Sequence, residues 1–82
     1  MANDSNKVRP EHVAEALDDV RDSMRQYAMS EADTSDADLL DEILGEAKDL
    51  LKAEEIGDAE TAHTLARHIA GLAVLYMARG IA

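Results

Sequence analysis

Apolar residues in the first part of the chain recur with a seven-residue period. Their successive spacings are four, three, four and three, at Val13, Leu17, Val20, Met24 and Tyr27. This narrow apolar line resembles one strand of a coiled coil. Pro10 suits the first position of a helix, where an N–H group has no partner within the helix. The pattern therefore predicts a helix over about residues 10–31.

A broader apolar face follows the polar stretch Glu31–Asp36. The apolar positions of this second segment are Leu39, Leu40, Ile43, Leu44, Ala47, Leu50 and Leu51. They cover core-facing and flanking directions of one helix. Ser35 is placed to cap its first turn, and Gly57 to close it in a left-handed conformation. We predict a second helix over about residues 36–56.

The third segment is the most apolar part of the chain. Between Ile69 and Ala78 no side chain is charged or strongly polar, so a helix here needs cover on all sides. Asp58 is placed to cap its start, and Gly80 to end it. The helix predicted over about residues 58–80 carries one line of small residues, which permits close approach of another helix backbone. That line is Ala59, Ala62, Ala66, Ala70 and Ala73.

These elements predict an all-α fold with one domain, residues 10–82, after a flexible polar lead-in, residues 1–9. The short joint at Gly57 and Asp58 predicts an antiparallel hairpin or a sharp elbow. The first helix either completes a three-helix bundle or swings away as an arm. Both arrangements leave one side of the last helix uncovered, and we expect a second copy of the chain to cover it. The predicted interface of this homodimer or larger oligomer consists of Ala62, Ala66, Ile69, Ala70, Leu72, Ala73, Tyr76 and Met77.

Composition supports self-association. The chain has 82 residues, 46% of them hydrophobic, but no Phe, Trp or Cys. Small side chains bury little area each, and a single core of this size is marginal without disulfides. No apolar run approaches the roughly 20 residues that span a bilayer, and the polar N-terminus is unlike a signal peptide. We expect a soluble cytoplasmic protein without membrane contact.

The charge is strongly negative and unevenly distributed. The net charge is −10, and all 18 acidic residues lie at or before Glu60, so the first two helices carry the acidic surface. Such a field repels nucleic acid. It either serves only solubility or forms a docking face for a protein partner with basic character. The candidate face comprises Glu11, Glu15, Asp18, Asp22, Asp38, Glu42, Glu46 and Asp49.

Candidate chemistry is sparse. Glu60 and His63 are three residues apart and share a helix face, the spacing by which helical carboxylate proteins bind di-iron centres. The ordinary alternative is a first-turn acid beside a surface histidine. His63 and His68 are five apart, unlike the four-residue spacing of helical zinc ligands. With no Gly-rich phosphate loop or nucleophile motif, we expect no enzyme activity, no catalytic residues and no cofactor.

These features favour a small acidic, non-catalytic protein-interaction or regulatory module that acts as a homo-oligomer. Two alternatives remain open. One is an acidic inhibitor that mimics nucleic acid and blocks a basic nucleic-acid-binding protein, as small phage counter-defence proteins can. The other is a carboxylate–histidine metal protein assembled across a dimer.

Overall fold

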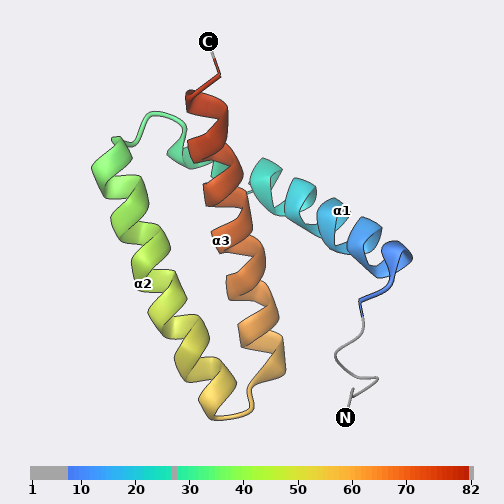
Figure 1. Cartoon of the computed structure of the whole chain (residues 1–82). Coiled ribbons are helices and arrows are strands. Elements are labelled where there is room, and N and C mark those ends of the chain that lie inside the picture. Colours follow the sequence, from blue (N-terminus) through green and yellow to red (C-terminus); the bar gives the residue numbers. More distant parts are fainter. Residues whose placement is uncertain (1–7, 27, 82) are drawn as a thin grey trace.

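The computed structural model describes residues 8–26 and 28–81. It contains α1 (Pro10–Gln26), the short 3₁₀ helix η2 (Ala28–Glu31), α2 (Asp36–Glu55) and α3 (Ala59–Arg79). The predicted all-α fold is confirmed, and the described ranges contain no β-strand (Figure 1). Most of the predicted lead-in, residues 1–9, lies outside the described residues, as does Tyr27.

The first helix is shorter than predicted. Its α-helical part ends at Gln26 rather than near residue 31, and the chain tightens into η2. Helices often end in 3₁₀ turns, because the last carbonyl groups lack partners within the helix. Here the guanidinium of Arg79 donates to the carbonyl oxygens of Glu31 (3.0 Å) and Ala32 (3.2 Å). It also pairs with Asp36 at 2.7 Å, so the end of α3 is tied to the loop that leads into α2.

The hairpin of α2 and α3 forms as its capping residues predict. Ser35 Oγ accepts a hydrogen bond from the Asp38 N–H at 3.2 Å, and Asp58 Oδ1 accepts one from the Thr61 N–H at 3.1 Å. Between the helices Gly57 has φ 75°, the left-handed conformation that glycine adopts without strain. Hydrogen bonding from the side chain and then the backbone of Thr61 holds the pKa of Asp58 below its ordinary 3.8.

The core of the single chain is small. Leu39 of α2 and Leu72 of α3 are fully buried, and Leu75 joins them at 8% exposure. Met24 of α1 and Ile43 of α2 pack against this cluster while remaining partly exposed. No residue of α1 is itself buried in the described structure. The hairpin therefore supplies most of the core, and α1 adds to it near its C-terminal end.

Helix α1 runs obliquely across α3 instead of lying along the hairpin (Figure 1). At the crossing, Ala16 and Val20 of α1 lie with Ala66 and Ala70 of α3 around a small apolar cavity of about 230 Å³. The alanines of α3 thus permit the close approach of a helix, and within one chain that helix is α1. Near the N-terminal end of α1, Val13 is 43% exposed and Leu17 58% exposed, so half of its apolar line is uncovered.

Candidate functional site

Helix α2 has two apolar lines, only one of which is used by the core of the chain. The inward line holds Leu39 and Ile43, which pack in the cluster with α3, and Ala53, which is 4% exposed. The outward line holds Leu40, Leu44, Ala47 and Leu51, again spaced four, three and four residues. Its leucines are 45%, 55% and 62% exposed, in that order along the chain. The second line is therefore a complete apolar stripe without a partner among the described residues.

Helix α3 extends this stripe. Each residue of a helix lies at an angle around the helix axis, measured from the line along which the two helices touch. In two antiparallel helices, residues rotated in the same sense from that line, each viewed along its own chain direction, lie on the same side of the pair. The contact line passes through Leu39 and Leu72. Rotation in the same sense from this line leads to Leu40 and Leu44 on α2 and to Tyr76 and Met77 on α3. We define the hairpin face by the residues that share this side. They are Leu40, Leu44, Ala47 and Leu51 of α2, with Ile69, Ala73, Tyr76 and Met77 of α3.

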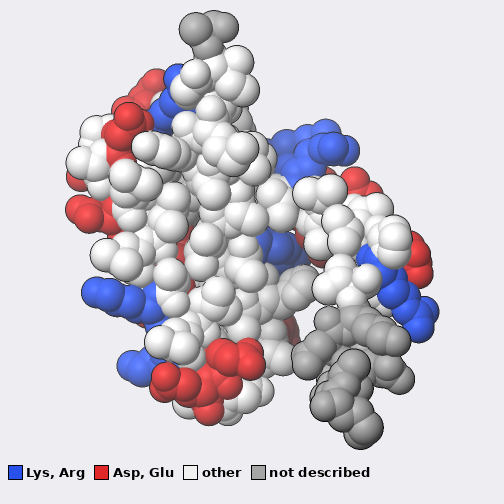
Figure 2. All heavy atoms as spheres, in the orientation of Figure 1, with Lys and Arg blue, Asp and Glu red and all other residues white. Residues whose placement is uncertain are grey.

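The hairpin face is apolar and accessible. Tyr76 is 42% exposed and Met77 69% exposed, while Ile69 and Ala73 are half-buried. Figure 2 shows a broad area without Lys, Arg, Asp or Glu over α2 and α3, with charged groups around it. Exposed apolar areas of this kind, surrounded by polar residues, mark surfaces that bind another macromolecule.

The structure divides the interface residues that the sequence predicted on the last helix into three groups. Leu72 is 0% exposed and Ala62 8% exposed, so both already belong to the interior of one chain, where a second copy cannot reach them. Ala66 is exposed and Ala70 half-buried, and both lie at the crossing with α1. The remaining four lie on the hairpin face: Ile69, Ala73, Tyr76 and Met77.

The predicted acidic face is continuous only on α1. Its members on α1 and the outer ones on α2 are exposed: Glu11, Glu15, Asp18, Asp22, Asp38 and Asp49. Glu42 and Glu46 are instead half-buried. Glu46 Oε1 lies 3.1 Å from His68 Nδ1 of α3, and Oε2 of Glu42 is buried without a hydrogen-bond partner in the described structure. The two glutamates are turned toward the hairpin interior because they flank the inward apolar line.

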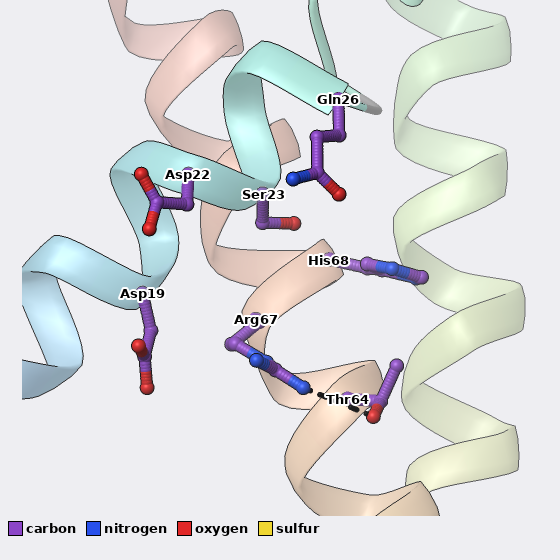
Figure 3. A pocket seen from close by; sticks show the side chains of 7 residues that line it. All are labelled: Asp19, Asp22, Ser23, Gln26, Thr64, Arg67 and His68. Atoms are coloured by element: carbon purple, nitrogen blue, oxygen red, sulfur yellow. Dashed lines mark hydrogen bonds between the residues drawn. The ribbon is translucent and has the colours of Figure 1, made fainter.

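A polar cleft of about 340 Å³ lies between α1 and α3 (Figure 3). It is lined by Asp19, Asp22, Ser23 and Gln26 of α1 and by Thr64, Arg67 and His68 of α3. Arg67 donates to Thr64 Oγ1 at 3.2 Å, and the ring of His68 extends toward α2, where it meets Glu46. Ser23 Oγ is buried without a hydrogen-bond partner in the described residues, so no base is paired with it as a nucleophile would require.

The candidate metal pair is not assembled into a site. Glu60 and His63 are both exposed, and His63 Nε2 lies 3.7 Å from Asp19 Oδ2 of α1. In the described ranges no group of three or more His, Cys, Asp or Glu side chains is placed to hold a metal ion. His63 thus interacts with the crossing helix rather than with an acid one turn away on its own helix.

Sequence reasoning identified the apolar residues of α2 but missed their division between two faces. It assigned Leu40, Leu44 and Leu51 to one broad apolar face that covered core-facing and flanking positions. The signal was present in the spacing, because neighbours such as Leu39 and Leu40 lie about 100° apart on a helix and cannot share one contact line. A single small partner helix covers only one of two such lines.

Comparisons with known proteins add no function. No protein-family model matches the chain, and no curated protein and no solved structure shows a significant match. None of the described helices has the combination of length and hydropathy needed to cross a membrane.

Proposed function

We propose that this chain is a small acidic, non-catalytic protein-interaction module that acts as a homo-oligomer. The observation that carries the proposal is the hairpin face, an apolar stripe on α2 that is continued by Tyr76 and Met77 on α3. Its three leucines, Tyr76 and Met77 are between 42% and 69% exposed in the single chain. Removing such side chains from water is the main favourable contribution to protein association.

The small core supports the same proposal. The buried hydrophobic residues in the described structure are Leu39, Ala53, Ala62, Leu72 and Leu75. Two of these five are alanines, which bury little area. A core so limited gains stability when further apolar surface is covered by another chain.

Sedimentation velocity of the purified chain tests this proposal. We expect a dimer or larger species at micromolar concentration, with dissociation on dilution. A monomer that remains folded at high concentration would contradict the homo-oligomeric function. The same measurement on Leu44→Glu reports whether any association depends on the hairpin face.

A second candidate is an inhibitor that offers its acidic surface to a basic protein. Glu11, Glu15, Asp18 and Asp22 favour it, because all four are exposed on α1. Asp18 and Asp22 lie 3.6 Å and 3.7 Å from arginines on the same exposed surface, pairs that water and salt weaken. Binding to an immobilised basic nucleic-acid-binding domain should then fall with added salt and with Glu15→Lys. Binding unchanged by either would remove this candidate.

A further inference from the structure

We propose that the hairpin face is covered by the same face of a second copy, with the two α2 helices antiparallel across a two-fold axis. The inference rests on the proposed self-association and adds to it the surface, the direction and the register. Three observations carry it: the repeat of the outward line of α2, the charges beside that line, and the area that the single chain leaves exposed.

The outward line of α2 fits an antiparallel copy of itself. Together with Ala37 it continues the alternating three- and four-residue spacing of a coiled-coil seam over Ala37, Leu40, Leu44, Ala47 and Leu51. In an antiparallel pair one register aligns the four positions from Leu40 to Leu51 at once. Leu40 then packs against Leu51 of the second copy, and Leu44 against Ala47. Each central layer combines a large and a small side chain, which lets the two helices approach closely.

The charges beside this line favour the antiparallel direction. Asp41 and Lys48 are the residues that directly follow Leu40 and Ala47, and both are exposed. In the described structure neither forms an ion pair, and their separation of seven residues keeps them apart on one helix. In the register above, Asp41 of each copy lies beside Lys48 of the other. A parallel pair would instead bring Asp41 level with Asp41 and Lys48 level with Lys48.

This arrangement also reduces the repulsion between two acidic chains. Each copy carries a net charge of −10, so association requires a contact area free of unpaired acids. Asp38 and Asp49 lie on the opposite flank of α2 from the outward line. The outward line itself carries no acid, so a second copy meets less like charge there than on the flank of Asp38 and Asp49.

The chain exposes more area than a compact monomer of its mass, and more than one interface of standard size would cover. The whole chain exposes 6244 Å². A compact monomer of 8.9 kDa exposes about 4,800 Å², so the surplus is about 1,400 Å². A stable interface of standard size needs about 800 Å² from each partner.

Charge exchange on α2 tests the inference, with the dissociation constant of the dimer as the measured quantity. If Asp41 and Lys48 meet across the two-fold axis, Asp41→Lys and Lys48→Asp each weaken the dimer by about tenfold, because two attractive pairs become repulsive. The double variant restores the opposite pairing and returns the dissociation constant close to that of the original chain. General repulsion alone predicts that Asp41→Lys tightens the dimer, because it lowers the negative charge.

A pair of matched leucine variants locates the interface. Leu44 and Leu17 are 55% and 58% exposed, but only Leu44 lies on the hairpin face. We expect Leu44→Glu to weaken the dimer by at least about 100-fold, since it places a carboxylate in both copies of the central layer, and Leu17→Glu to leave it intact. Circular dichroism serves as the control and should show that both variants stay helical.

The outcomes separate this inference from the proposed function. A dimer that dissociates with Leu17→Glu but not with Leu44→Glu, or one that the double charge exchange fails to restore, overturns the antiparallel α2 arrangement alone. A chain that never dimerises overturns both. Loss with each single charge change and recovery in the double variant supports the arrangement.

Discussion

The two apolar lines of α2 are alike in sequence and differ in their surroundings. Leu39 is 0% exposed, and Leu40, the next residue, is 45% exposed. The inward line packs against α3 and holds the fold together. The outward line has the same helical spacing, but no other part of the described structure covers it. Periodicity therefore reports how many contacts a helix is built to make. It does not report whether they lie within one chain or between two.

The largest effect should separate the two lines by their roles. Leu39→Ala should lower the free energy of unfolding by about 2–5 kcal/mol, because it leaves a cavity in the small Leu39–Leu72–Leu75 cluster. The matched variant Leu40→Ala should change the stability of the monomer by no more than about 0.5 kcal/mol. Urea unfolding under dilute conditions that favour the monomer measures both. Equal losses of unfolding free energy in the two variants would mean that the two lines contribute equally to the stability of the monomer.

A smaller effect is expected at Arg79, which ties the end of α3 to the start of α2. Its guanidinium joins Asp36 and the carbonyl oxygens of Glu31 and Ala32. Arg79→Ala should cost about 1–3 kcal/mol of unfolding free energy, because the charged donor to Asp36 and to the carbonyl oxygens of Glu31 and Ala32 is lost. Arg79→Lys keeps the charge near Asp36 but cannot make all three contacts, so an intermediate loss is expected. If both variants match the original chain, this anchor does not stabilise the fold.

Both faces of α2 begin in the turn that Ser35 caps. Ser35→Ala should destabilise the chain by about 1 kcal/mol, because the N–H of Asp38 loses its acceptor. Ser35→Asp supplies a substitute acceptor and serves as the control. Thermal unfolding, monitored by circular dichroism, measures the difference. An alanine variant as stable as the original chain would show that this cap contributes little.

The smallest effect concerns the other end of the hairpin and depends on pH. The pKa of Asp58 is held below 3.8 by hydrogen bonding from Thr61, so its ionised form stabilises the fold. That contribution is present above pH 3.8 and is lost as the pH falls through the lowered value. Asp58→Asn keeps an acceptor that does not titrate. The unfolding free energy of this variant should fall less steeply in acid than that of the original chain. If the unfolding free energies of the two proteins change in parallel with pH, ionised Asp58 does not stabilise the fold.

The fold was predictable where single residues determine local geometry. Ser35, Gly57 and Asp58 cap and join the helices as expected, because each acts on backbone groups within a few residues. The anchoring of the loop after η2 was not predictable, because its carbonyl oxygens accept hydrogen bonds from Arg79, which is distant in sequence. The inward turn of Glu42 and Glu46 was missed for a similar reason: helix spacing gives no direction until the partner helix is placed.

The candidate site was predictable only in part. The sequence indicated an uncovered side on the last helix, and Tyr76 and Met77 are indeed exposed there. It placed Leu72 on that side, although Leu72 fills the core against Leu39. It did not separate Leu40 and Leu44 from the core residues beside them. Separating these residues requires knowledge of which side of each helix is covered by another helix. That depends on the tertiary structure, which the spacing of residues does not give.

Distances between spin labels on two copies of α2 test the central claim most directly. The chain has no cysteine, so a single introduced cysteine gives one label per chain. Gly45 has no atoms within 4 Å of an added Cβ, and Lys52 is exposed, so Gly45→Cys and Lys52→Cys both accept a label.

The antiparallel register places the two Gly45 positions nearly level and offsets the two Lys52 positions by about 20 Å along the helix axis. Pulsed electron paramagnetic resonance should therefore give a short distance for the first pair and a much longer one for the second. Similar distances for both pairs would show a parallel arrangement, and the absence of any distance between chains would show that α2 has no such partner. Either result contradicts the antiparallel pairing of the two α2 helices.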